Sequence, residues 1–241
     1  MEQDYIVHNG KKYEYYIIRK RIKNIYMRID KNKNIIISAP KKVSNKYLGK
    51  FVESKISWVE KQLNYYDSMP NTKEQLDFEN DELTYYLGKQ YKLKIIPSKE
   101  NSISCDGKYL YLRVKEQYIH DKKYKENAYE KCLKSIAMEL LTSLVIVYQD
   151  KLKEYKIPMP TVEIRKMKSK WGCCIPSKKH VKFNLKLMNS PLYCIEYVVI
   201  HELAHFKYQN HSKDFYRFIE IFMPDWKERR KILNKKYGRV V

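Results

Sequence analysis

The chain has 241 residues, of which 44% are hydrophobic and 14% aromatic. This length allows one large domain or two small ones, and the composition excludes a disordered or low-complexity protein. The formal charge is +21, from 49 basic and 28 acidic side chains. Such an excess favours contact with a polyanion such as nucleic acid, although a solvated basic surface without a dedicated partner gives the same count.

The sequence predicts a cytoplasmic protein with reduced thiols. Its first ten residues are polar, unlike a signal peptide, and the longest apolar stretch, residues 140–148, is too short to cross a bilayer. The cysteines are odd in number and contain no CxxC pair: Cys105, Cys132, Cys173, Cys174 and Cys194. We therefore expect no membrane association, and the sequence indicates no particular oligomeric state.

The first part of the chain alternates between strands and one helix. Tyr- and Ile-rich segments predict strands at residues 12–20, 24–30 and 34–40. Ser44 is the expected N-cap of a helix whose apolar residues recur at helical spacing as far as Leu63. The polar residues 67–80 predict a linker or long loop, and a second group of strands is expected at 83–96 and 102–114, with turns at Gly88 and at Asp106-Gly107.

A long helix is predicted from Lys122 to about Tyr155, because apolar residues recur there on one stripe. Strands at 161–167 and 180–188 then flank a loop at 169–179. The pattern predicts an α+β fold, with a strand-rich region containing one helix over residues 1–115 and a second compact region over residues 120–241.

Three helices are predicted near the C-terminus. Ser190 is placed as the N-cap of the first, with Pro191 at its first helical position, where a missing N–H costs nothing. Ser212 can cap a second helix that stops before Pro224. Asp225, with a glutamate three residues later, resembles a capping box for a final helix that ends near residue 238.

The first of these helices carries the sequence HELAH, from His201 to His205. Residues four apart lie on one face of a helix, so both imidazoles can bind one zinc ion. Glu202 projects beside that space and can act as the general base on a zinc-bound water. The alternative is a pair of surface histidines on an ordinary amphipathic helix.

A catalytic zinc site needs a third protein ligand, and His211 is the preferred candidate. Asn210 tolerates left-handed backbone and could turn the chain back toward the helix. Glu220 is a rival ligand, because some zinc peptidases use a downstream glutamate. A cysteine ligand from Cys173 or Cys174 is a second rival, since peptide deformylases combine HExxH with an upstream cysteine.

The segments SKWGCC, HELAHFKYQNHS and PDW, together with residues 19–62, resemble the YgjP-like, SprT-related family of zinc metallopeptidases. The resemblance covers nearly the whole chain and implies a compact zincin-like catalytic domain over residues 120–241. It also implies that His201, His205 and His211 bind Zn²⁺ and that Glu202 is the general base. Lys170, Cys173 and Tyr216 depart from the usual Arg, Ser and Trp of the family pattern.

The expected activity is hydrolysis of a peptide bond in a peptide or protein substrate. A deformylase-like amidohydrolase and a nucleic-acid-associated zinc protein are the alternatives. Residues 184–187 are a candidate edge strand for pairing with substrate, and Tyr208 and Tyr216 are candidate donors to the tetrahedral oxyanion. Trp171 and Phe183 are expected to anchor the core or a loop, and His180 is expected at the surface.

Overall fold

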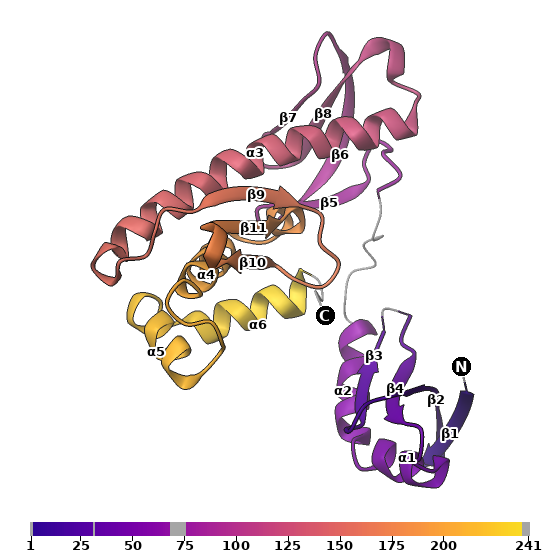
Figure 1. Ribbon diagram of the computed structural model, residues 1–241. Coiled ribbons are helices and arrows are strands. Elements are labelled where there is room, and N and C mark those ends of the chain that lie inside the picture. The colour runs from indigo at the N-terminus through magenta and orange to yellow at the C-terminus, as the bar shows by residue number, and fades with distance from the viewer. Residues whose placement is uncertain (1, 31, 68–75, 238–241) are drawn as a thin grey trace. The chain divides into compact units, whose positions relative to one another are not determined.

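A computed structural model describes residues 2–30, 32–67 and 76–237. Helices and strands are both abundant, which confirms the predicted α+β class (Figure 1). The chain forms two compact units, Met1–Asn71 and Thr72–Val241. Most of the linker predicted at residues 67–80 lies outside the described residues.

The first unit is a four-stranded sheet with two helices. Its strands have the order β1-β2-β4-β3, with β2 and β4 parallel and the other pairs antiparallel. The elements are β1 (Glu2–His8), β2 (Lys11–Lys20), β3 (Tyr26–Ile29), β4 (Ile35–Pro40), α1 (Asn45–Glu53) and α2 (Ile56–Asp67).

The helix predicted from Ser44 is broken into α1 and α2. Ser44 is the N-cap, as predicted, and its side chain accepts a hydrogen bond from the backbone of Tyr47. The break falls at Ser54, whose hydroxyl donates to the carbonyl oxygen of Phe51 at 2.8 Å. Such a bond competes with the backbone ladder of a helix, which explains why the apolar periodicity continues across two helices.

Both helices pack on one face of this sheet. Alternate residues of β2 and β4 point toward them, as the period of a strand requires. The buried apolar cluster comprises Tyr13, Tyr15, Ile17, Ile29, Ile35, Ile37, Ala39, Leu48, Val52, Ile56 and Val59. On the opposite face, Tyr5, Val7 and Tyr26 are more than half exposed, at 56%, 57% and 59%. The helices therefore leave that face open to solvent.

The second unit contains two sheets and four long helices. Its strands have the orders β5-β6-β8-β7 and β10-β11-β9. The elements are β5 (Leu83–Tyr86), β6 (Lys89–Ser98), β7 (Ser102–Cys105), β8 (Tyr109–Lys115), α3 (Lys122–Lys151), β9 (Thr161–Arg165), β10 (Gly172–Ile175), β11 (His180–Asn184), α4 (Leu192–Ala204), α5 (Lys213–Phe222) and α6 (Trp226–Lys236), with short 3₁₀ helices at Glu116–Tyr118, Lys153–Tyr155, Pro176–Lys178 and Leu185–Asn189.

The hairpin between β5 and β6 contacts the segment that precedes α4. The backbone N–H of Leu87 donates to the carbonyl oxygen of Met188 at 2.7 Å. Gly88 has φ +81°, and a Cβ there would lie 2.5 Å from Pro191, so only glycine fits. The second group of strands therefore packs within the second unit, and the compact units divide earlier than the predicted regions 1–115 and 120–241.

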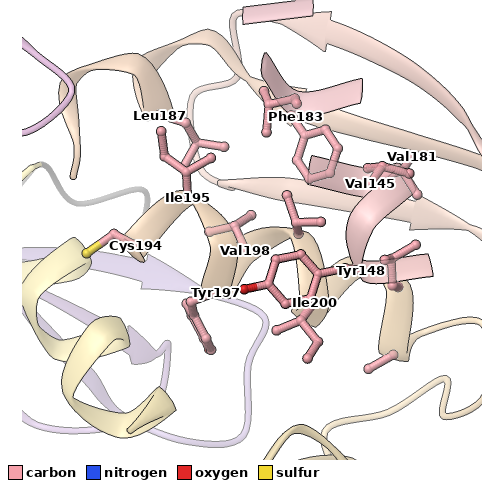
Figure 2. Close-up of a cluster of buried hydrophobic side chains, with 14 of the residues drawn as sticks. Val145, Tyr148, Val181, Phe183, Leu187, Cys194, Ile195, Tyr197, Val198 and Ile200 are labelled. Atoms are coloured by element: carbon pink, nitrogen blue, oxygen red, sulfur yellow. The ribbon is translucent and has the colours of Figure 1, made fainter. Parts of the chain in front are cut away.

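The core of the second unit lies between α3, β11 and α4. Figure 2 shows this cluster, in which Val145 and Tyr148 of α3 and Phe183 of β11 surround Ile195 and Val198 of α4. These side chains are at most 7% exposed. Because close-packed cores resist displacement, α4 is a rigid support for the residues at its end.

Among the described helices, α3 is the one that is long and apolar enough to cross a membrane by length and composition. Its apolar window has a mean hydropathy of 1.4, and 28% of that window is buried in the structure. The prediction that the apolar stretch is too short considered residues 140–148 alone. One side of α3, from Leu133 to Val145, belongs to the core described above, whereas Ile146 and Val147 are about half exposed.

The loop predicted at residues 169–179 contains strand β10, which was not predicted. Asn184, fully buried at the end of β11, donates to the carbonyl oxygens of Met167 and Lys170 at 2.8 Å each. These bonds hold the chain that leads into β10. The edge strand predicted at residues 184–187 is wrong, because β11 is the central strand of its sheet and a 3₁₀ helix follows it.

Candidate metal centre

The helix that carries HELAH begins one residue later than predicted. Pro191 is the N-cap of α4, and the hydroxyl of Ser190 instead donates to the carbonyl oxygen of Leu187 at 2.6 Å. Nine of the thirteen residues of α4 are buried, including Glu202. The helix is therefore apolar on nearly all sides and runs through the core.

The chain reverses directly after α4. The helix ends at Ala204, His205 is its C-cap, and the N–H groups of Phe206 and Lys207 bond the carbonyl oxygens of Leu203 and Ala204. Asn210 does not have a positive φ, so the predicted left-handed turn at that residue is wrong. The C-terminal turn of α4 already redirects the chain toward α5, whose predicted N-cap Ser212 accepts a bond from Phe215.

This reversal brings His201, His205 and His211 together. One ring nitrogen of each lies within 4.8 Å of those of the others, and the Nε2 atoms of His201 and His211 are 3.0 Å apart. Phe215 packs against all three rings, with centroid distances between 4.7 and 4.9 Å. Three converging imidazoles supported by one aromatic ring form a preorganised ligand set.

Two of the histidines have partners on the nitrogen that faces away from the cluster. The Nδ1 atom of His205 lies 3.0 Å from the carbonyl oxygen of Tyr208, which can only accept, so Nδ1 carries the proton and Nε2 has a free lone pair. The hydroxyl of Tyr197 lies 3.4 Å from Nδ1 of His201. Outer partners of this kind fix the ring orientation and tautomer of metal-binding histidines.

The surroundings keep all three imidazoles neutral. Burial, aided by the charges of His205, His211 and Arg230, lowers the pKa of His201 to about 3. Burial also lowers the pKa of His205 and of His211. Neutral imidazoles offer lone pairs to a metal at neutral pH without first losing a proton.

Glu202 lies on the adjacent turn of α4 and is 4% exposed. Burial raises the pKa of its carboxyl to about 8, while the backbone N–H of Cys174 and the charge of Lys170 act in the opposite direction. A nearby dication would also lower this pKa, because it favours the charged form. Burial and a nearby dication therefore act on this pKa in opposite directions.

Strand β10 lies directly against Glu202. A Cβ on Gly172 would lie 2.5 Å from Oε1 and 2.6 Å from Cγ of Glu202, closer than real Cβ contacts. Trp171, just before the strand, is anchored by its indole N–H, which donates to Asn234 of α6 at 3.0 Å. The WGCC segment therefore holds β10 beside the carboxylate of Glu202.

A tyrosine and an arginine lie beside the histidines, and only the tyrosine was predicted from the sequence. The ring of Tyr216 lies 22° from parallel with that of His211, at a centroid distance of 6.0 Å, and stacks on Trp226. Arg230 of α6 donates to the hydroxyl of Tyr216 at 3.1 Å. No local spacing links residues 216 and 230 to the HELAH motif, since the contact depends on how α6 packs.

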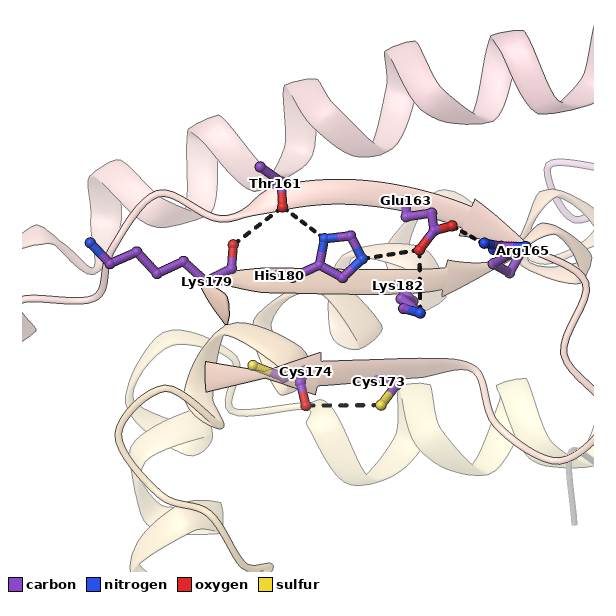
Figure 3. Close-up of polar contacts among 8 residues, drawn as sticks. All are labelled: Thr161, Glu163, Arg165, Cys173, Cys174, Lys179, His180 and Lys182. Carbon is purple, nitrogen blue, oxygen red and sulfur yellow. Dashed lines mark hydrogen bonds and ion pairs between the residues drawn. The ribbon is translucent and has the colours of Figure 1, made fainter. Parts of the chain in front are cut away.

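The rival ligands lie outside the cluster. The group of potential ligands that the structure brings together contains the three histidines and neither Glu220 nor a cysteine, within the described residues. Glu220 is exposed and lies 3.7 Å from Lys227. Cys173 pairs in register with Lys182 and points to the sheet face away from the core, and Cys174 packs against the core (Figure 3).

His180 takes part in a separate polar network on that outer face. Its ring nitrogens lie 2.7 Å from the hydroxyl of Thr161 and 3.0 Å from Glu163 (Figure 3). Hydrogen bonds from His180 and Arg165 lower the pKa of Glu163 to about 2. The network joins β9 to β11 and is distinct from the three-histidine cluster.

The donor set fits a zinc ion. Zinc binds imidazole nitrogen at 2.0–2.1 Å, which places two tetrahedral ligands about 3.3 Å apart. Ring nitrogens within 4.8 Å of one another are close enough to reach that arrangement by small side-chain movements. With three nitrogen ligands, one position remains for water or substrate, as in catalytic zinc sites.

Comparisons with known proteins identify the family of this chain. The metallopeptidase zymogen abylysin of Pyrococcus abyssi, a solved structure, is 27% identical; the match covers 42% of this chain and 99% of that chain, with a TM-score of 0.37. The search of curated proteins found no match. A family model described as "YgjP-like, metallopeptidase domain" matches residues 23–236 of this chain. The chain therefore belongs to the YgjP-like family and is a metallopeptidase that acts on peptide or protein substrates.

Proposed function

We propose that this metallopeptidase uses zinc, held by His201, His205 and His211, and that Glu202 is its general base. The observation that carries the proposal is the convergence of three neutral imidazoles beside a buried carboxyl group. A bound zinc ion would supply a Lewis acid that polarises the scissile carbonyl and makes water more acidic.

In this proposal Glu202 carries out both proton transfers. Glu202 accepts a proton from the attacking water and later returns it to the leaving amine, the usual cycle of a carboxylate general base and acid. The backbone N–H of Cys174 orients the carboxylate during both transfers. Burial of Glu202 beneath β10 excludes bulk water from the proton that it carries.

We infer that the substrate lies along β10. Among the described residues this strand pairs with β11 on one side only; on its other side the N–H of Cys174 bonds Glu202, and no further strand adjoins it. An extended peptide can add to such an edge by main-chain hydrogen bonds. Because Gly172 contacts Glu202, a peptide at this edge would pass close to the carboxylate.

Tyr216 is the better of the two candidate oxyanion donors. The ring of Tyr208 packs on Phe218 at a centroid distance of 5.6 Å. The hydroxyl of Tyr216 accepts a hydrogen bond from Arg230, which leaves the hydroxyl proton available for donation. A charged donor on the same oxygen strengthens that donation, which suits stabilisation of a developing oxyanion.

The test combines metal analysis with two variants. Purified protein should contain about one zinc ion per chain. In the variant Glu202→Gln, zinc content should persist while kcat on a quenched fluorescent peptide library falls by about 10²- to 10⁴-fold. In His211→Ala, both zinc content and activity should fall, whereas Glu220→Gln serves as a matched acidic control and should retain both.

Three outcomes would contradict the proposal. The first is a Glu202→Gln variant with parental activity. The second is zinc loss in Glu220→Gln but not in His211→Ala. The third is a preparation that cleaves formylated peptides only at the formyl group, which would favour the deformylase alternative.

A further inference from the structure

The first unit has a concentration of positive charge that the peptidase site does not use. Residues 1–71 carry 15 Lys and Arg against 7 Asp and Glu, hence +8 on less than a third of the chain. Three of the seven acidic side chains have partners within the unit. Glu2 pairs with Arg19, Glu14 with Lys12, and Glu60 accepts from Tyr13.

The positive charge gathers at one end of the sheet. Strands β2 and β4 run parallel and end side by side, with Lys20 paired in register with Pro40. The loops that follow them, residues 21–25 and 41–44, therefore leave the sheet at the same end. This end of the sheet belongs to the first unit alone.

Two adjoining hollows lie between these loops, and they share Lys23 and Pro40. The larger, of about 640 Å³, extends to Tyr47 and Phe51 of α1. The smaller, of about 370 Å³, is lined by residues 20–23 and 40–42. Neither is lined by an acidic residue.

Five exposed cations surround the two hollows: Lys20, Arg21, Lys23, Lys41 and Lys42. None of them forms an ion pair with any residue that the structure describes. Cations spread over two loops and two hollows exceed what one small anion needs, and they suit a ligand with several phosphates.

Exposed aromatic rings adjoin the same surface. Tyr47 lines the larger hollow and is 59% exposed. Tyr26 is also 59% exposed and shares a cross-strand row with Ser38, the row next to Lys20 and Pro40 on the open face of the sheet. Aromatic rings beside unpaired cations are the two components of a single-strand nucleic-acid surface, on which bases stack while phosphates meet the cations.

We propose that this surface at the end of the sheet, defined by residues 20–25, 40–44 and Tyr47, binds single-stranded nucleic acid. An acidic peptide would satisfy the cations but leave the tyrosines without stacking partners. An anionic membrane surface would also satisfy the cations, and the vesicle measurement below separates it from nucleic acid. The proposed contact is with the sugar–phosphate backbone and the base faces, so it requires no particular sequence.

The experiment measures binding by the full chain with fluorescence anisotropy, using labelled single-stranded DNA of about 15 nucleotides and the RNA of the same sequence. The triple variant R21E, K41E and K42E should bind at least about tenfold more weakly, with the salt slope reduced by about two, the value for three lost phosphate contacts. Tyr47→Ala should weaken binding by roughly tenfold, as expected for the loss of one stacked base.

A matched control reverses three lysines of the same unit that line neither hollow, K11E, K50E and K55E. It makes the same change in net charge and should weaken binding by less than about threefold. Circular dichroism verifies that each variant is folded. Cleavage of a short peptide should be unchanged in the triple variant, so this proposal and the proposed zinc chemistry can fail independently.

Absence of oligonucleotide binding by the parent chain at low salt would overturn the proposal. Equal weakening in the two triple variants would also overturn it, because bulk charge would then explain the binding. Binding to phosphatidylserine vesicles without binding to either oligonucleotide would replace the nucleic acid by a membrane surface. A difference between the DNA and RNA arms would identify which nucleic acid is preferred.

Discussion

Replacement of Gly172 by alanine tests the contact between β10 and the carboxyl group of Glu202. The added Cβ would lie 2.5 Å from Oε1, 2.6 Å from Cγ and 2.7 Å from Cδ of Glu202. Ordinary contact begins at 3.4 Å, so the two groups must separate by about 0.7 to 0.9 Å. Either the carboxylate moves away from the histidines, or β10 shifts outward.

Both movements should reduce activity more than they reduce stability. Displacement of a catalytic group by about 1 Å costs roughly 10²-fold in rate, so kcat should fall by about that factor. Overpacking a core position costs about 1–3 kcal/mol, which thermal unfolding measures separately. Zinc content should remain at the parental level, because Gly172 contacts Glu202 rather than a histidine.

Gly49→Ala is the matched control for this substitution. A Cβ there would lie 3.5 Å from Tyr15 and 3.6 Å from Ile6, which is ordinary contact. Gly49 is inside α1, where alanine is favoured over glycine by up to about 1 kcal/mol. Parental kcat and melting temperature in Gly172→Ala would refute the inferred contact, and a loss of zinc would show that the site as a whole had moved.

Three further predictions follow from the same site. Burial raises the folded-state pKa of Glu202 from 4.5 to about 8, so its contribution to the stability of chelator-treated protein is complete below pH 4.5 and is lost as the pH rises through 8. The melting temperature of the Glu202→Gln variant should lack this decline, and an equal decline in parent and variant would contradict the prediction. Burial raises the pKa of Cys174 to about 12 and of Cys194 to about 11, so iodoacetamide at pH 8 should label the exposed Cys105 first, as peptide mapping would show. Peptides N-methylated at positions that face β10 should have a raised KM, whereas methylation of alternate residues should have little effect; equal effects at both sets would exclude strand addition.

The sequence predicted the convergence of the three histidines well because its information is local. His201 and His205 are one helical turn apart, so their proximity follows from helix geometry alone. His211 lies six residues after His205, so a short reversal of the chain is enough to bring it to the same end of the helix. The reversal itself was predicted for the wrong reason, since the end of α4 provides it without a left-handed Asn210.

The surroundings of the cluster depended on contacts between distant segments. Strand β10 has only four residues, GCCI, with no alternation that would indicate a strand. It exists because Asn184 holds the preceding loop and β11 offers a partner edge. Arg230 reaches the site only through the packing of α6 on α4, which no spacing in the sequence encodes. The cytoplasmic location and the domain assignment remain predictions.

Burial of Glu202 links these two kinds of information. The motif places a glutamate beside the histidines, but only the fold decides whether water surrounds that carboxyl group. Here β10 covers it so closely that Gly172 has no room for a side chain, and the covering strand is an outer strand of its sheet. If a peptide adds to β10 as proposed, it further closes access to the carboxylate, so substrate binding would be coupled to exclusion of water. The same contact therefore accounts for the raised pKa of Glu202 and for the direction in which the substrate is expected to lie.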